Sequence, residues 1–79
     1  MKRIRIDQPL TKDDPWTELS RLFGIRNCSD PQEFEHRMLQ LREPVILETA
    51  SRKYLGRQVS DILESIQQKS DCVYVIWGA

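Results

Sequence analysis

The sequence predicts a small single α/β domain, in which a three-stranded, mostly parallel sheet is packed by helices. Residues 45–47 form a short apolar run directly after Pro44, and residues 72–77 form a second run rich in β-branched and aromatic residues. Between the two runs, apolar residues repeat at the spacing of one helix face: Val59, Ile62, Leu63 and Ile66. Strand, helix and strand in this order form a βαβ unit with parallel strands. Continuous apolar runs are typical of strands that are buried on both faces.

The first strand is predicted at residues 2–7, where the pattern alternates. Ile4 and Ile6 point to one side, whereas Arg3 and Arg5 point to the other. This alternation indicates a strand with one wet face or a position at the edge of the sheet. Pro9 ends the strand, and a turn is expected over residues 11–14.

Two helices are expected next, and each begins with an Asp-Pro pair, at residues 14–15 and 30–31. The aspartate caps the helix, and proline at the first helical position loses no needed N–H. Glu33, at the third position of the second helix, completes a capping-box arrangement. Gly24 ends the first helix, because glycine adopts the left-handed conformation at no cost. The apolar faces are Trp16, Leu19, Leu22 and Phe23 in the first helix and Phe34, Met38 and Leu41 in the second.

The remaining elements follow from breaks in the pattern. Residues 43–44 (Glu-Pro) end the second helix, and Gly56 separates the strand at residues 45–47 from a third helix near residues 57–69. A short helical turn over residues 51–55 is a further possibility. The predicted order is therefore β-α-α-β-α-β, with all strands parallel if the crossovers are right-handed. The strand order stays open, and so does the choice between helices on one face and helices on both.

The composition excludes several classes of protein. Seventy-nine residues make one domain, 1–79, and a content of 39% hydrophobic and 30% charged residues is ordinary for a globular chain. Twelve basic and twelve acidic residues give no net charge, which argues against a nucleic-acid partner. The longest apolar run, residues 72–77, is far shorter than the roughly 20 residues that span a bilayer. Two cysteines make no disulfide framework, so we expect a cytoplasmic protein with reduced thiols.

Few residues could support catalysis. His36 is the only histidine, and we interpret it as a surface residue rather than a general base. Cys28 and Cys72 are 44 positions apart without a Cys-x-x-Cys motif, so neither a zinc nor an iron–sulfur site is expected. Cys28 precedes the cap of a helix, where a thiolate is favoured, but we prefer a structural role in a tight connection. Cys72 is expected in the core. We predict no enzyme activity and no cofactor.

The acidic middle of the chain is one candidate binding surface. Residues 27–49 carry two basic and five acidic side chains, so a partner at this surface would be basic. The candidate contact residues lie in the segment 27–37: Asn27, Asp30, Glu33, Glu35 and Arg37. Asp30 and Glu33 are also explained as capping residues. A solvated helix face is therefore the alternative interpretation.

A basic loop is the other candidate. Arg52, Lys53 and Arg57 follow the carboxyl end of the strand at residues 45–47 and lead into the third helix. Ligands often bind at that edge of an open α/β sheet, and a helix N-terminus adds positive potential. An anion such as phosphate would fit there. The alternative is a solvated loop that Tyr54 and Leu55 anchor to the core.

The pattern resembles that of the barstar family of small ribonuclease inhibitors over nearly the whole chain. The matching pieces are Ile4-Arg5-Ile6, Leu19 through Phe23-Gly24-Ile25, Phe34 through Leu41, Pro44 through Glu48, Val59 through Ile66, and Val73 through Trp77. The resemblance implies the same fold and a role as a protein inhibitor. The family's hallmark, a Tyr-Gly-x-Asn-Leu-Asp-Ala-Leu-Trp-Asp type segment, is absent: residues 27–38 read Asn-Cys-Ser-Asp-Pro-Gln-Glu-Phe-Glu-His-Arg-Met. Arg37 stands close to the place of the family's key acid.

These observations favour a small non-enzymatic protein-binding module, inhibitor or immunity-like, that contacts its partner through residues 27–37. The expected partner is another protein, for example a basic one such as a nuclease, and not a membrane. The alternative is an anion- or nucleotide-binding regulatory domain that uses the basic loop 52–57. An enzyme that uses Cys28 ranks last. We also expect Trp77 to be substantially buried.

Overall fold

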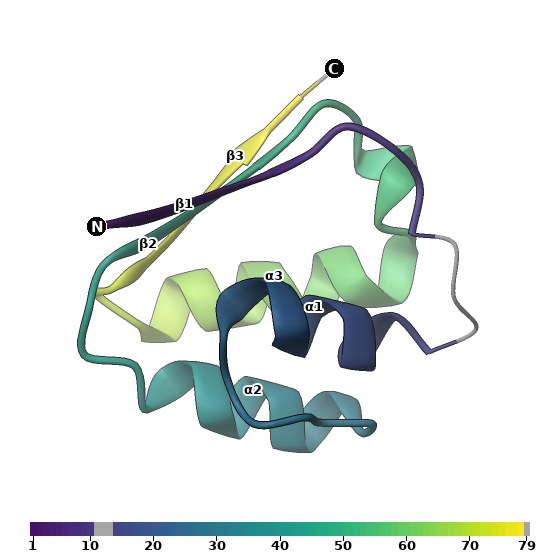
Figure 1. Cartoon of the computed structure of the whole chain (residues 1–79). Coiled ribbons are helices and arrows are strands. Elements are labelled where there is room, and N and C mark those ends of the chain that lie inside the picture. The colour runs from purple at the N-terminus through teal and green to yellow at the C-terminus, as the bar shows by residue number, and fades with distance from the viewer. Residues whose placement is uncertain (11–13, 79) are drawn as a thin grey trace.

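The computed structural model describes residues 1–10 and 14–78, and its elements follow the predicted order β-α-α-β-α-β (Figure 1). The elements are β1 (Lys2–Ile6), α1 (Pro15–Phe23), α2 (Pro31–Leu39), β2 (Val45–Thr49), the 3₁₀ turn η1 (Arg52–Tyr54), α3 (Arg57–Lys69) and β3 (Val73–Trp77). The third helix covers the predicted residues 57–69, and η1 lies in the segment 51–55 where a helical turn was considered. The turn expected over residues 11–14 falls largely on residues 11–13, which lie outside the described residues.

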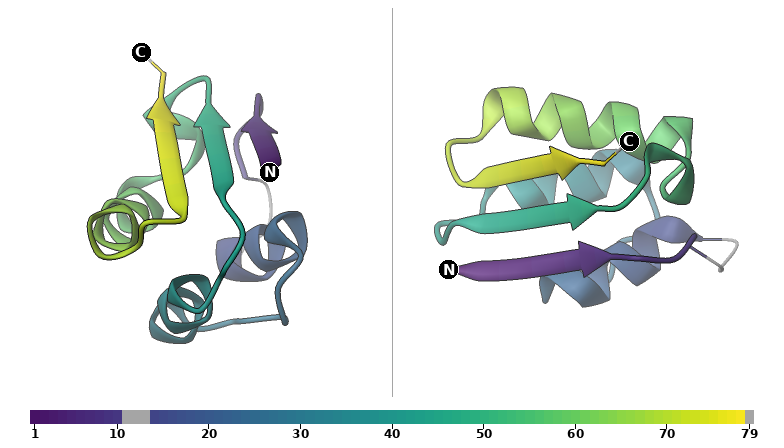
Figure 2. Two further views of the ribbon diagram at one scale, coloured as in Figure 1. Left: turned by 90° about the vertical axis from the view of Figure 1, so that its left-hand side faces the viewer. Right: turned by 90° about the horizontal axis from the view of Figure 1, so that it is seen from above.

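The three strands form one parallel sheet in the order β1-β2-β3, which confirms the predicted fold class. The register aligns Ile4 with Leu47 and Val75 across the sheet. Two right-handed crossovers that step in the same direction place their helices on the same face of a sheet. Figure 2 shows this arrangement, with α1, α2 and α3 on one side of the strands. The first strand lies at an edge, as predicted, and β3 forms the other edge.

The core fills the space between the sheet and the three helices. Its largest fully buried apolar side chains are Phe34, Leu19, Met38, Leu47, Leu63, Ile66 and Val73. The Phe34 ring lies between two aromatic rings of α1, with centroid distances of 5.4 Å to Trp16 and 6.0 Å to Phe23. These tilted contacts are a favoured geometry for aromatic pairs, and they join α1 to α2.

The second face of the sheet is open, so of the two arrangements that the sequence leaves open, the described residues show helices on one face only. In β3, Val73 and Val75 are buried, but Tyr74 is 52% exposed and Ile76 is 45% exposed. The cause is topological, because no helix of the described chain crosses this face. Cys72, which was expected in the core, precedes β3 and is only half-buried. Trp77 is partly buried and packs against the core, in line with the burial expected for it.

The helix ends largely follow the sequence signals. The Asp14 carboxylate accepts hydrogen bonds from the Trp16 N–H (3.1 Å) and the Thr17 hydroxyl (2.7 Å). Gly24 has a φ of +72°, the left-handed conformation that glycine tolerates best. The second helix ends at Leu39 rather than at residues 43–44. Beyond Leu39 the hydrogen bonds span three residues instead of four: the Gln40 N–H donates to the Arg37 carbonyl, and the Leu41 N–H donates to the Met38 carbonyl.

Candidate functional site

The connection between α1 and α2 is fixed by a buried relay of hydrogen bonds. The Cys28 N–H donates to the Ser20 hydroxyl (3.2 Å), which itself donates to the Trp16 carbonyl (2.7 Å). The Cys28 thiol donates to the Arg26 carbonyl (3.1 Å) and is fully buried. This environment agrees with a structural role for Cys28, since reactive thiols lie in partly exposed positions.

Glu35 fastens α2 to α3 and does not point freely into solvent. Its Oε2 accepts a hydrogen bond from the Ser65 hydroxyl (2.7 Å) and an ion-pair contact from the Lys69 ammonium (3.3 Å). The Ser65 hydrogen bond is the largest cause of the lowered pKa of Glu35. Burial, the next in size, raises the pKa, and the Lys69 hydrogen bond and charge lower it by smaller amounts. Arg37, on the same helix, is half-buried, and its Nε has no hydrogen-bond partner among the described residues.

The other three residues of the predicted 27–37 surface are exposed. The Asp30 Oδ2 accepts from the Glu33 N–H (3.3 Å), so these two side chains lie on the first turn of α2. Asn27 instead lines a separate cavity of about 350 Å³ together with Thr17, Arg21 and Ile25. The structure therefore brings Asp30 and Glu33 together, whereas Asn27 belongs to a different concave surface.

The basic residues of the loop lie in η1 (Arg52 and Lys53) and at the first position of α3 (Arg57). The Ser51 hydroxyl accepts from the Lys53 N–H (3.2 Å) and caps the turn. The Arg52 guanidinium donates to Glu64 Oε1 (2.8 Å) and lies 4.2 Å from the centroid of the Trp77 ring, a cation–π geometry. Lys53 and Arg57 take part in no ion pair with any residue in the ranges 1–10 and 14–78.

The three predicted basic residues do come together at one cavity. This cavity measures about 290 Å³ and is lined by Arg52, Lys53, Gly56, Arg57, Ser60 and Asp61. The prediction missed Ser60 and Asp61, which lie on the first turns of α3. Their signal in the sequence is weak, because polar residues at these positions are expected on any solvated helix.

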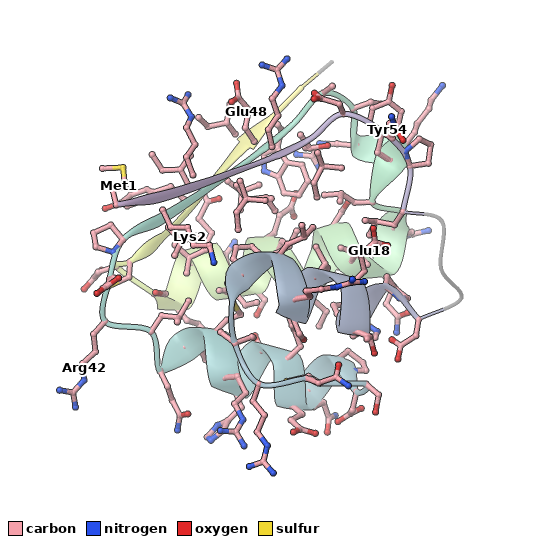
Figure 3. The ribbon with its side chains drawn as sticks, in the orientation of Figure 1. Met1, Lys2, Glu18, Arg42, Glu48 and Tyr54 are labelled. Atoms are coloured by element: carbon pink, nitrogen blue, oxygen red, sulfur yellow. The ribbon has the colours of Figure 1, made fainter. Side chains whose placement is uncertain are left out.

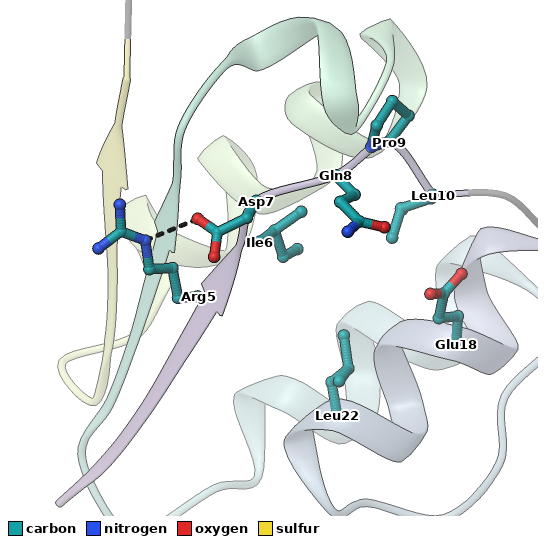
Figure 4. Close-up of a pocket in the computed structure, with 8 residues that line it drawn as sticks. All are labelled: Arg5, Ile6, Asp7, Gln8, Pro9, Leu10, Glu18 and Leu22. Carbon is teal, nitrogen blue, oxygen red and sulfur yellow. Dashed lines mark hydrogen bonds and ion pairs between the residues drawn. The ribbon is translucent and has the colours of Figure 1, made fainter.

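A third cavity lies between the end of β1 and α1 (Figure 4). It also measures about 290 Å³, and Arg5 on its wall donates to Asp7 Oδ1 (2.7 Å). Figure 4 shows Glu18 pointing from α1 toward the segment that follows β1, and its Oε1 is buried without a partner among the described residues. Residues 11–13, which continue this segment, are not described, so we assign no ligand to this cavity.

The open sheet face is a candidate that the sequence pattern did not indicate. The register places Arg3, Ile46 and Tyr74 in one row across it, and Arg5, Glu48 and Ile76 in the next. Figure 3 shows Glu48 on the side of the sheet away from the helices. Its carboxylate lies 3.5 Å from the Arg3 guanidinium.

Arg5 on the same face has a raised pKa, caused by the Asp7 hydrogen bond, the Asp7 charge and the Glu48 charge in that order. It therefore stays cationic at any physiological pH. The open face thus changes from charged at β1 to apolar at β3.

Other kinds of site are not found within the described ranges. No group of three or more His, Cys, Asp or Glu side chains could hold a metal ion there, and no helix there has the length and apolar character needed to cross a membrane. His36 is exposed, with its Nε2 3.3 Å from the Gln40 side-chain nitrogen. Three surfaces carry the arguments about function that follow: the open sheet face, the first turn of α2 and the cavity at α3.

Comparisons of this chain with protein-family models, with curated proteins and with solved structures found no match. The resemblance to the barstar family stays a hypothesis that depends on the sequence pattern.

Proposed function

We propose that this domain is a small non-enzymatic protein-binding module. The observation that supports this proposal is the uncovered face of its parallel sheet, because parallel sheets are almost always covered on both faces. Tyr74 and Ile76 are exposed there beside the half-buried Ile46. Exposed apolar side chains that lie together mark interaction sites, and tyrosine is among the residues enriched at the centre of interfaces.

The chemistry of this face suggests the complementary surface. Arg3 and Arg5 border the apolar side chains and are mostly exposed, while Glu48 and Asp7 neutralise part of their charge. A partner with an apolar patch and an acidic border would match this distribution. The docked partner would take the place that a second layer of helices has in a larger α/β protein.

The first turn of α2 is a second candidate contact surface for the same function. Asp30 and Glu33 are exposed there and would suit a basic partner, as in the inhibitor or immunity-like role implied by the barstar resemblance. Glu35 is less available because it is bound to Ser65 and Lys69. The helix α2 lies on the opposite side of the molecule from the open face (Figures 1 and 2), so the two surfaces can be tested independently.

Two matched double variants test the proposal. Tagged wild-type protein would be used to isolate a stoichiometric partner. The affinity of this partner for the wild type and for two double variants would be measured by titration calorimetry. The variants are Tyr74→Ser/Ile76→Ser on the open face and Gln32→Lys/Glu33→Lys on the first turn of α2, where Gln32 is exposed beside Glu33. We expect the first variant to weaken binding by at least about tenfold, as for the loss of central interface residues. Glu43→Lys, an exposed charge change outside both surfaces, is the control and should bind as wild type does.

The outcomes separate the two surfaces. Loss of binding only in Gln32→Lys/Glu33→Lys would move the contact to α2, and a basic ribonuclease as the partner would then support the inhibitor role. A stoichiometric partner whose affinity is unchanged in both double variants would contradict both contact surfaces. A folded domain that retains no partner would contradict the protein-binding function.

A further inference from the structure

We infer that the N-terminus of α3 binds a phosphate group, carried by inorganic phosphate or by a small phosphate monoester. This inference is independent of the proposed protein contact, because it depends on other residues. The site is the cavity of about 290 Å³ at the start of α3, and four features of its walls support the assignment.

The first feature is a helix N-terminus without a side-chain cap. The aspartates Asp14 and Asp30 accept the first N–H groups of α1 and α2, but α3 begins at Gly56, which has no side chain to do so. Gly56 has φ +83° and ψ 166°, a conformation that is essentially limited to glycine. The first N–H groups of α3 and the helix dipole therefore favour an anion in front of residues 57–59.

The second feature is the open space beside Gly56, which itself lines the cavity. A methyl group built on Gly56 would meet no atom within 4 Å. In contrast, a methyl group on Gly24, at the end of α1, would come within 2.8 Å of the Lys2 ammonium. The cavity is therefore not crowded at the position of Gly56.

The third feature is a buried hydroxyl without a partner. Ser60 lines the cavity, is only 6% exposed, and has no hydrogen-bond partner for its Oγ among the described residues. Its N–H is bonded to the Gly56 carbonyl (3.0 Å), which places Ser60 one turn into α3. The Cα–Cβ bond of Ser60 tilts toward the N-terminus of α3, as on any helix, and Ser60 is one of the residues that line the cavity. A phosphate oxygen held there would accept the hydrogen bond that the protein leaves unmade.

The fourth feature is the charge of the walls. Lys53 and Arg57 supply cationic groups that form no ion pair with any described residue, whereas Arg52 already donates a hydrogen bond to Glu64. Asp61 also lines the cavity and opposes an anion. The cavity is at the lower limit of ordinary ligand pockets, which begin at about 300 Å³, so it suits a phosphate group better than a whole nucleotide.

Titration of the ¹⁵N-labelled full chain with inorganic phosphate, followed by NMR at constant ionic strength, tests this assignment. We expect saturable shifts concentrated in the amides of residues 56–60, with no equivalent shifts when chloride replaces phosphate. A parallel titration with glycerol phosphate distinguishes the two sources of the group. Tighter binding of the ester indicates a monoester ligand, and equal or weaker binding indicates inorganic phosphate.

Three variants and a control sharpen the test. Ser60→Ala should weaken phosphate binding about fivefold through the lost hydrogen bond, without lowering the melting temperature, since the free protein loses only an unpartnered hydroxyl. Arg57→Gln should weaken it about threefold, and Asp61→Asn should strengthen it by a similar factor. Arg42→Gln removes an exposed charge at the other end of the molecule (Figure 3) and should have no effect.

The inference would be overturned by shifts that do not saturate, or by shifts that chloride reproduces. It would equally be overturned if Ser60→Ala bound phosphate with unchanged affinity, because the buried hydroxyl would then have no part in the site.

Discussion

The contacts of Glu35 in the structure give it a different role from the one expected from the sequence. In the sequence it belongs to an acidic segment that would attract a basic partner, yet in the structure its carboxylate binds Ser65 and Lys69. The Ser65 hydrogen bond stabilises the charged form, and this lowers the pKa of Glu35 in the folded state. The charged carboxylate is therefore part of what holds α2 on α3.

The lowered pKa predicts how stability depends on pH. A carboxyl group with a lowered folded-state pKa stabilises the protein above its ordinary pKa, and this stabilisation is lost as the pH falls through the folded-state pKa. We expect Glu35→Gln to melt below wild type at pH 7 and the difference to shrink as the pH falls below about 4.5. Thermal unfolding by circular dichroism from pH 7 to pH 3 measures this. A difference that stays constant with pH would contradict it.

We expect truncation of the two tryptophans to lower the free energy of unfolding by different amounts. Trp16 is 4% exposed and packs on Phe34, so Trp16→Ala should destabilise the domain by about 3–5 kcal/mol. Trp77 is half-buried beneath Arg52, and we expect Trp77→Ala to cost about 1–3 kcal/mol, within the usual range of single substitutions. Urea unfolding followed by circular dichroism compares the variants, and equal costs would contradict the difference in burial.

Among the elements, β3 combines three environments within five residues. One side packs on the core, the other side faces solvent, and no strand among residues 1–10 and 14–78 pairs with its outer edge. Exposed edges with unpaired N–H groups invite pairing with other chains. Here Gln67 of α3 occupies part of that edge, because its Oε1 accepts a hydrogen bond from the Val75 N–H (3.0 Å).

Removal of this side-chain cap should expose the edge of β3. We expect Gln67→Ala to speed the hydrogen exchange of the Val75 amide by at least about fivefold, consistent with the loss of one net hydrogen bond. Amide exchange measured by NMR tests this, with Gln68→Ala, an exposed neighbour on α3, as the control. Unchanged exchange at Val75 would show that Gln67 does not protect the edge.

At the scale of the whole molecule, strand order determines which surfaces are free. Because β1, β2 and β3 follow one another across the sheet, α1, α2 and α3 lie on one face, and the strand order does not reverse anywhere in the part of the chain that the structure describes. The crevice that usually binds ligands in open α/β sheets depends on such a reversal. The cavity at α3 must therefore be explained by its local walls, and not by this general rule.

Substitutions on the open face are expected to change the surface without changing the stability of the fold. Tyr74 and Ile76 already contact water, so Tyr74→Ser/Ile76→Ser should alter the free energy of unfolding by less than about 1 kcal/mol, since surface substitutions usually have small effects. Val75→Ala on the buried side of the same strand should cost more. Urea unfolding of both variants measures the contrast, and a larger loss in the double variant would mean that this face is part of the core.

Much of this fold is encoded locally, and for that reason the sequence predicts it. The Asp-Pro pairs, Gly24 and the helical spacing after Gly56 each depend on neighbours within a few positions. The open face is not predictable in this way, because Tyr74 and Ile76 continue an apolar run whatever covers them. The Glu35 contact joins residues 30 positions apart, and the buried position of Ser60 depends on how α3 packs. Such features require the tertiary structure.

The Arg52 guanidinium over the Trp77 ring gives this domain an intrinsic optical reporter. Trp16 is enclosed in the core and would supply a constant fluorescence background, whereas the emission of Trp77 depends on a cation that also lines the cavity at α3. A ligand that draws Arg52 away from the ring would change the emission of Trp77 alone. Occupancy of this cavity could then be followed in unlabelled protein, with Trp77→Phe as the silent reference.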